Sequence, residues 1–349
     1  MKTVLVIGRF TTESFALHIA ETLVDMGYNV ERFVPDRMPA SKDGLFAHRI
    51  NQVRRVLFGL AVNVPSIRAW HMKALWNMIQ GKKIDYVIST HDFLQPNEVK
   101  KLKTLTNAKL CMWFPDTLVT FGKAYFMNSC YDGLFFKDPY IIKALFKVPT
   151  SPIYYMPECF NPKKHRFDGT VIESKYKCDI TTAGNAHSWR VAFYNHLSQY
   201  NVKIWGPRAP IWMPKQAIEN KFQSHLVYNE EKAKAFLGAK IVVNNLLYGE
   251  IWGLNVRTFE AAGIGAFQMV DWRAGLSQLF EDGKEIVSFN SLDDMHQKID
   301  YYLQNPELRD EIAKAGKVRA LREHTYELRL KLILETLDGN ANGFALPMI

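Results

Sequence analysis

The stretch "VVNNLLYGEIWGLNVRTFEAAGIGAF", from Val242 to Phe267, runs from an apolar strand through a glycine-punctuated loop into a helix. Brief runs rich in Val and Ile are typical of strands covered on both faces by crossover helices. Asn255, Arg257 and Glu260 fall on the opening turns of that helix, where no apolar surface demands them. The stretch therefore predicts a parallel sheet with a polar site beyond the carboxyl end of a strand.

The same alternation of short apolar runs and helical spacing recurs along the chain and restarts near its middle. The expected strands lie at residues 3–8, 29–34, 86–90, 109–114, 133–136 and 152–157, and then at 178–184, 202–206, 225–228, 240–245, 266–270 and 285–289. With 349 residues, the chain is longer than one ordinary core requires. We expect an α/β protein of two doubly wound, Rossmann-like domains that face each other across a cleft.

The domain boundary should lie where prolines and a basic run interrupt the periodicity, between residues 158 and 172. This predicts a first domain at residues 1–165, a second at 166–338 and an irregular tail at 339–349.

Several classes of protein are disfavoured by the composition. The start "MKTVLVIGRF" has only four consecutive apolar residues before Gly8, too few for a signal peptide, and no run approaches the roughly 20 apolar residues of a spanning helix. Four scattered cysteines, without a CxxC pair, favour neither a zinc site nor a disulfide framework. We therefore expect a cytoplasmic protein.

The net charge of +9 is concentrated in one segment. Between Asp36 and Lys83, nine Lys and Arg residues stand against two Asp residues, a net charge of +7. The segment predicts a basic helical insertion at residues 37–83, which is either a solvated face or a contact for anionic lipid headgroups at the inner face of the plasma membrane. Nucleic acid remains a less favoured partner, although aromatic residues are interleaved with the basic ones.

A second loop after a strand carries phosphate-binding chemistry. "TTAGNAHSWR", from Thr181 to Arg190, lacks the GxGxxG fingerprint of dinucleotide sites. It nevertheless offers Gly184, backbone donors at a helix N-terminus and the cation Arg190, which together suit a phosphate. A glycine in such a turn is also common for steric reasons alone.

The helix in the opening stretch has two interpretations. If it begins near Asn255, its free amides and the guanidinium of Arg257 suit a diphosphate, and the carboxylate of Glu260 suits a vicinal diol. Alternatively, Asn255 is an N-cap and Glu260 an acid that the helix dipole favours. The alternative does not explain Arg257, because a cation at that end opposes the dipole.

From about Cys178 to Leu337 the chain resembles the glycosyltransferase group-1 family, in its branch related to the CgeB spore-maturation protein. The resemblance is carried by "KIVVNN" (240–245), "GLNVRTFEAAGIGAF" (253–267), "GLSQLFEDGKEIVSF" (275–289) and "IAKAGKVRALREHTYELR" (312–329). The first half matches more loosely, through "WFPDT" (113–117), "DGLFFKDP" (132–139) and "IYYMPECFNP" (153–162).

This resemblance implies a GT-B fold, in which the second domain binds a nucleotide-sugar donor, here of the UDP or GDP type, and the first domain faces the acceptor. Glu260 matches the glutamate that holds the ribose in the family. The residues expected near the diphosphate are Gly184, Asn185, His187, Arg190, Asn255 and Arg257. Many relatives carry a further glutamate where this chain has Trp252, so Glu250, Gly253 and Leu254 are the candidate contacts of the donor sugar.

Catalytic candidates come from the first domain. In "YVISTHDF", His91 occupies the place of a family histidine that faces the donor sugar, and Asp92 beside it could orient the acceptor or act as a base. Asp116 in "WFPDT" is a second acid on the acceptor side. No DxD motif of the metal-dependent kind stands in a strand-end loop. We therefore expect neither a metal nor a cofactor, with amides and arginine stabilising the departing diphosphate.

The sequence thus predicts a glycosyltransferase that moves a sugar from a nucleotide-diphosphate donor to a cell-envelope or lipid-linked glycan, with retention of configuration. A retaining reaction needs no protein nucleophile, whereas an inverting one would use Asp92 or Asp116 as the base. Two alternatives stay open: a nucleotide-sugar 2-epimerase of the same fold, and a non-enzymatic protein that binds lipid or nucleic acid.

Overall fold

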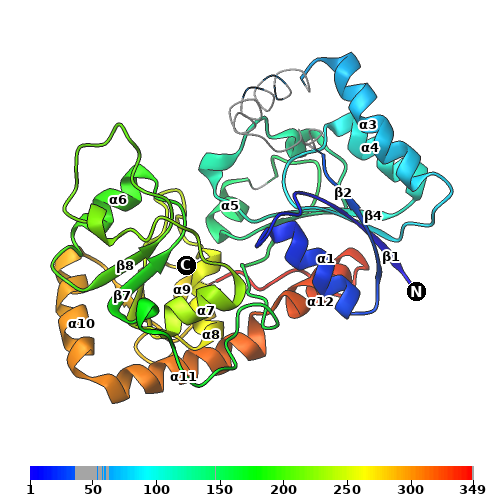
Figure 1. Cartoon of the computed structure of the whole chain (residues 1–349). Helices are drawn as coiled ribbons and strands as arrows, with labels where there is room; N and C mark the ends of the chain where they lie inside the picture. The colour runs from blue at the N-terminus through cyan, green and yellow to red at the C-terminus, as the bar shows by residue number, and fades with distance from the viewer. Residues whose placement is uncertain (36–52, 54–56, 58, 60–62, 146, 348–349) are drawn as a thin grey trace.

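A computed structural model describes residues 1–35, 53, 57, 59, 63–145 and 147–347. Most of the basic segment expected at 37–83 lies outside these residues, and its described end forms helix α3 (Pro65–Ile79). Two parallel sheets form two α/β domains, which lie side by side in Figure 1.

The first domain is built on a six-stranded parallel sheet with the order β2-β1-β3-β4-β5-β6. Its strands are β1 (Thr3–Ile7), β2 (Asn29–Phe33), β3 (Tyr86–Ser89), β4 (Lys109–Phe114), β5 (Gly133–Phe136) and β6 (Ile153–Tyr155). One face packs on α3, α4 (Pro96–Thr106) and α5 (Pro139–Ala144), and the other on α1 (Phe15–Asp25). Strands covered on both faces are apolar over most of their length, as β1, β3, β4 and β5 are, whereas the edge strand β2 carries Glu31 and Arg32 and is mostly not buried.

The second domain has a five-stranded parallel sheet with the order β11-β10-β9-β7-β8. Its strands are β7 (Cys178–Ala183), β8 (Val202–Trp205), β9 (Ala239–Asn244), β10 (Gln268–Asp271) and β11 (Val287–Phe289). Its helices are α6 (Ser188–Asn195), α7 (Asn229–Leu237), α8 (Val256–Ile264), α9 (Leu276–Leu279), α10 (Leu292–Gln304) and α11 (Pro306–Glu323). The strand order reverses between β7 and β9, which is where doubly wound sheets bind ligands.

The strand expected at residues 225–228 is wrong. This segment is an irregular loop that leads into α7, although Val227 is buried as a strand residue would be. Ser224 and Asn229 on either side adopt positive φ angles of 63° and 48°, so the chain turns there and cannot stay extended. The other eleven predicted strands are present.

Helix α12 (Tyr326–Leu337), expected within the second domain at 166–338, instead returns to the first domain. Its buried residues Leu330 and Ile333 join the cluster that contains Val4 and Trp113. The chain therefore crosses between the domains twice, and the two crossings are held together by a backbone hydrogen bond of 3.0 Å from Phe160 N to His324 O. In Figure 1, α12 lies beside α1 on the first domain.

The tail expected at 339–349 has no helix or strand in its described part, yet it is anchored. Phe344 N donates to Tyr155 O at 2.9 Å, and the two aromatic rings meet edge to face. Across the described part of the chain, no helix combines the length and the apolar character that crossing a membrane requires.

Candidate functional site

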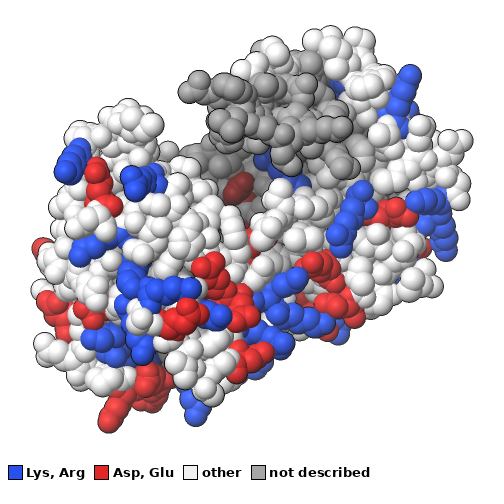
Figure 2. Space-filling model, in the orientation of Figure 1, with Lys and Arg blue, Asp and Glu red and all other residues white. Residues whose placement is uncertain are grey.

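A cavity of about 880 Å³ lies between the carboxyl ends of the two sheets. Residues of both domains line it, and Figure 2 shows the hollow between them. Of the predicted site residues, those on its wall are His91, Asp116, Gly184, Asn185, His187, Arg190, Glu250, Asn255, Arg257 and Glu260. Asp92, Gly253 and Leu254 are not among the lining residues.

The second domain gives the cavity a basic wall. Gly184, which follows β7, has a φ of +132°, and a Cβ built on it would stand 2.5 Å from Nη2 of Arg257 and 3.2 Å from Nη1 of Arg190. The glycine therefore lets both guanidinium groups close over the loop. Arg190 donates to Asn185 O at 2.8 Å, and its buried Nε has no hydrogen-bond partner among the described residues.

Arg257 is a buried cation without a described counter-ion. It is 8% exposed and donates to Oδ1 of Asn244 at 2.8 Å, and neither it nor Arg190 forms an ion pair with any carboxylate in the described part of the chain. Burial, together with the neighbouring charge of Arg190, lowers the pKa of Arg257 to about 10. Two adjacent cations held in this way favour an anion between them.

Asn255 acts as the N-cap of α8, as one interpretation of the sequence predicted. Its Oδ1 accepts from Thr258 N at 3.1 Å, and its Nδ2 donates to Asn244 at 3.0 Å, so its side chain is fully engaged. The first turn of α8 nevertheless opens into the cavity, because Asn255, Val256 and Arg257 all line it. The free backbone amides of that turn add positive potential to the basic wall.

Glu260 is buried deeper on the same helix, within a network that joins the domains. Its Oε1 accepts from Lys232 at 2.9 Å and lies 3.5 Å from Nε2 of His165. Lys232 also pairs with Glu13 of the first domain. Burial opposes ionisation of Glu260, but the charges of Lys232 and His165 and the hydrogen bond from Lys232 together hold the pKa of Glu260 below its usual range. The carboxylate is thus ionised, and its contacts within the described part of the chain are made through Oε1, which leaves Oε2 for a ligand.

Glu13, His18 and His165 place one ligand atom each within 4.8 Å of one another, a spacing that could hold a metal ion. Existing contacts already satisfy these groups. His165 accepts from Asn161 N through Nδ1 and donates through Nε2 to Glu13 at 3.1 Å, and burial lowers the pKa of His18 to about 4. The ammonium of Lys232 on Glu13 supplies the positive charge that a cation would bring.

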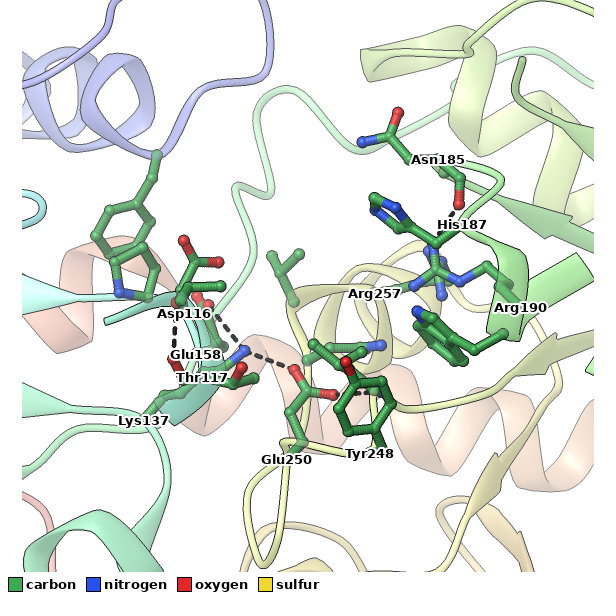
Figure 3. Close-up of a pocket in the computed structure, with 18 of the residues that line it drawn as sticks. Asp116, Thr117, Lys137, Glu158, Asn185, His187, Arg190, Tyr248, Glu250 and Arg257 are labelled. Atoms are coloured by element: carbon green, nitrogen blue, oxygen red, sulfur yellow. Dashed lines mark hydrogen bonds and ion pairs between the residues drawn. The ribbon is translucent and has the colours of Figure 1, made fainter. Parts of the chain in front are cut away.

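The first domain gives the cavity an acidic wall. Asp116, after β4, accepts from Nε2 of His91 at 3.3 Å, and both side chains line the cavity. Burial opposes ionisation of Asp116, but the hydrogen bond and charge of His91 and the charge of Lys137 together lower its pKa. Figure 3 shows Asp116 and Glu158 across the cavity from Arg190 and Arg257.

The structure corrects the expectation that Asp92 faces the acceptor. Its two carboxylate oxygens accept from the backbone amides of Tyr125 at 2.6 Å and Phe126 at 2.9 Å. This side chain therefore fixes the turn at 125–128 and is absent from the cavity wall, whereas its neighbour His91 lies on it.

Glu250 lies on the cavity wall but is already paired. Its Oε1 accepts from Lys137 of the first domain at 2.7 Å, and its Oε2 accepts from Leu247 N at 3.1 Å. Lys137 also approaches Oε1 of Glu158, at 4.0 Å. All three side chains are 5% exposed or less, so this is a buried ion-pair cluster at the domain interface.

Gly253 and Leu254, the other expected sugar contacts, have structural roles. A Cβ on Gly253 would stand 3.0 Å from Cα of Asp138, so this glycine allows the two domains to touch. Leu254 is buried in the apolar cluster around α8. The loop before α8 thus carries domain contacts where the sequence predicted sugar contacts.

Sequence reasoning missed Lys137 and Glu158, which line the cavity. Both directly follow or lie close after a strand of the first sheet, in "DGLFFKDP" and "IYYMPECF". The strand-end rule that selected His91 would have selected them too. The sequence-based prediction also missed Trp189 and Tyr248, whose ring centroids lie 6.3 Å apart on the cavity wall.

The second half of the chain is similar to proteins of known family. A family model described as "Glycosyl transferase-like" matches residues 188–335. The second domain is therefore similar to this family over most of its length. The spore protein CgeB of Bacillus subtilis is 26% identical over 201 residues, which cover 52% of this chain and 60% of CgeB. The chain thus aligns with less than two thirds of this relative, and both matches agree with the resemblance to the CgeB-like branch of the group-1 glycosyltransferases.

Solved structures match the whole architecture. HepE of Anabaena in complex with UDP-glucose superposes with a TM-score of 0.66 at 12% identity, covering 97% of this chain and 100% of that one. Sucrose-phosphate synthase of Thermosynechococcus elongatus superposes with a TM-score of 0.65 at 10% identity, covering 98% and 100%. The glycosyl transferase-like domain is therefore the second half of a complete GT-B fold.

Proposed function

We propose that this protein is a glycosyltransferase that transfers a sugar from a nucleoside-diphosphate donor to a glycan acceptor. The observation that carries the proposal is the polarity of the cavity. Two guanidinium groups that form no ion pair among the described residues stand on one wall with a helix N-terminus, and Asp116 with His91 stands on the other. A diphosphate fits the first wall, and a hydroxyl-rich sugar fits the second. The UDP-glucose complex of HepE, which shares the fold, supports the same class of donor.

In this proposal Arg257, Arg190 and the amides at the start of α8 stabilise the charge that develops on the departing diphosphate. The free Oε2 of Glu260 receives a ribose hydroxyl. We propose retention of configuration, in which the acceptor hydroxyl enters from the face that the diphosphate leaves, so that no protein nucleophile is needed. The anomer of the product, identified by NMR, tests this: an inverted product contradicts it and makes Asp116 the candidate base.

The donor class is tested by isothermal titration of the wild-type protein with UDP, GDP, ADP and CMP. Binding of one nucleoside diphosphate supports the proposal and names the donor sugars to screen for transfer. If none of the four binds, the proposal fails.

We predict that the reaction needs no divalent metal. Arginine and helix amides already supply the positive charge that a metal ion would bring to the diphosphate. Transfer activity should therefore be unchanged after dialysis against EDTA, measured by release of the nucleoside diphosphate. Activity that is lost on chelation and restored by magnesium would contradict this prediction.

We also propose that the acceptor is lipid-linked or part of the cell envelope, at the cytoplasmic face of the membrane. The basic segment 37–83 that first suggested this lies largely outside the described residues, but a second feature supports it. Ile211 is fully exposed and Trp212 is 74% exposed, at the tip of a loop flanked by Arg208 and Lys215. Tryptophan favours the interfacial region of a bilayer, and each nearby cation adds attraction to anionic lipid.

Replacing both Ile211 and Trp212 with Ser should lower binding to phosphatidylglycerol vesicles about tenfold or more, because two exposed apolar side chains no longer insert. Co-sedimentation measures this. Val171→Ser is the matched control, because Val171 is 75% exposed but lies elsewhere. Equal binding by all three proteins would exclude this loop as a membrane contact.

A further inference from the structure

Glu158 is a buried carboxyl group of the interdomain cluster, and the proposed chemistry gives it no role. It lies close after β6, where the chain leaves the first domain, and it is 4% exposed on the wall of the cavity. Its Oε2 is buried and has no hydrogen-bond partner among the described residues. Buried polar atoms are nearly always satisfied, so an orphaned one in a cavity wall points to a missing ligand atom.

Lys137 does not fully neutralise Glu158. Its Nζ lies 2.7 Å from Glu250 but 4.0 Å from Glu158, so the hydrogen bond goes to Glu250 and two carboxyl groups share one cation. The other charged and titratable groups that interact electrostatically with Glu158 are Asp116, Cys159, Glu260, Tyr326 and Arg329. Burial raises the pKa of Glu158 to about 8, against the attraction of Lys137. Near neutral pH this group is therefore a neutral carboxylic acid that can donate a hydrogen bond.

A neutral carboxylic acid can tell the uncharged sugar of a sugar nucleotide from its charged diphosphate. The diphosphate belongs at the basic wall, and Figure 3 places Glu158 on the opposite side of the cavity from Arg190 and Arg257. A hydroxyl group can both accept from a protonated carboxyl and donate to it, so a sugar satisfies the orphaned oxygen. Together these features limit the partner of Glu158 to an uncharged, hydroxylated group.

We propose that Glu158 hydrogen-bonds a hydroxyl of the donor sugar and thereby makes the site prefer the sugar nucleotide to the bare nucleoside diphosphate. The inference rests on the proposed function, since it takes a nucleotide sugar as the ligand of the cavity. It assigns to Glu158 the sugar-contacting role that the sequence had given to Glu250, Gly253 and Leu254.

The test compares the dissociation constants of UDP and UDP-glucose, or of GDP and GDP-mannose if GDP is the nucleotide that binds. Wild type, Glu158→Gln and Glu158→Leu are titrated at about pH 6.5 and about pH 9.5, on either side of the raised pKa. One hydrogen bond corresponds to a three- to tenfold preference for the sugar nucleotide. Wild type should show that preference at the lower pH and a larger one at the higher pH, where the ionised carboxylate of Glu158 accepts a charge-assisted hydrogen bond from the sugar hydroxyl. The glutamine variant should keep the preference at both, and the leucine variant should lack it at both.

Binding of the bare nucleoside diphosphate should stay within about twofold in all three proteins, because the basic wall is intact. If they bind it but show the same sugar preference, or if the pH dependence persists in Glu158→Gln, the inference is overturned while the proposed function stands. If wild type binds no nucleotide at all, both fail. Should Glu158→Leu not fold, the pH dependence in wild type and Glu158→Gln still decides.

Discussion

Arg257→Ala should weaken nucleoside-diphosphate binding about 100-fold, because it removes two charge-assisted hydrogen bonds worth roughly 1.5 kcal/mol each. Arg257→Lys should recover little of this loss, since an ammonium group keeps the charge but not the planar fork that contacts two oxygens at once. Titration with the nucleotide selected by the wild-type protein measures both effects.

The same substitution should not destabilise the fold. Arg257 is buried beside the like charge of Arg190, and its described hydrogen bond is to Asn244. Thermal unfolding of Arg257→Ala is therefore expected at or above the wild-type temperature, the usual exchange of stability for function at a binding site. Loss of folding would instead assign Arg257 a structural role.

Two further variants separate the site from general effects of charge. Gly184→Ala should also weaken binding, because the loop φ of +132° is unfavourable for alanine and the new Cβ would displace Nη2 of Arg257. Arg322→Ala removes an exposed arginine that pairs with Glu323 and should bind nucleotide as wild type does. Normal binding by Arg257→Ala or by Gly184→Ala would contradict the assignment of the basic wall.

Lys137→Ala should cost about 3–5 kcal/mol of unfolding free energy at pH 8, because it leaves Glu250 buried without its counter-ion. The cost should shrink as the pH falls. An unpaired buried carboxyl has a folded-state pKa above its unfolded value near 4.3, so its penalty is greatest above the folded-state pKa and vanishes below the unfolded one. Lys137 lowers the pKa of Glu158, which is about 8 in the wild type, so in the variant the expected window runs from above pH 8 down to about pH 4.

Urea denaturation at both ends of that window measures the effect, and the first domain supplies a matched control. Lys103 pairs with Asp132 at the same 2.7 Å, but its side chain is 36% exposed, so Lys103→Ala should cost less than about 1 kcal/mol at either pH. Equal losses in the two variants, or a loss in Lys137→Ala that does not depend on pH, would show that the interdomain cluster is not a buried ion pair in solution.

The sequence predicted the two sheets well because the strands are buried on both faces, and such burial leaves an unbroken apolar run. Residues 225–228 show the limit of this signal. Val227 is buried in a loop, and the positive φ angles of Ser224 and Asn229, two residue types that favour turns, keep the chain from extending there. Apolar composition reports burial, and only the backbone angles decide whether a buried segment is extended.

The sequence predicted which loops form the candidate site, because ligands of doubly wound sheets bind beyond the carboxyl ends of the strands. The rule selects loops, but it does not give the direction of a side chain within a loop. His91 reaches the cavity while Asp92 turns to the amides of residues 125 and 126. Glu250 and Gly253 belong to contacts between the domains, which no local pattern encodes because their partners, Lys137 and Asp138, lie more than 100 residues away in the sequence.

The return of α12 to the first domain bears on how the chain is made. Phe15 and Trp113 lie in the same apolar cluster as Tyr326, Leu330 and Ile333. Part of one face of the first sheet therefore stays exposed to solvent until residues 326–337 have been translated. About 170 residues separate β6 from that helix, which at 5–20 residues per second is a delay of roughly 10–35 s. The second domain has its strands and its helices in one continuous stretch, residues 178–323, so it can finish folding on the ribosome before the first domain receives helix α12.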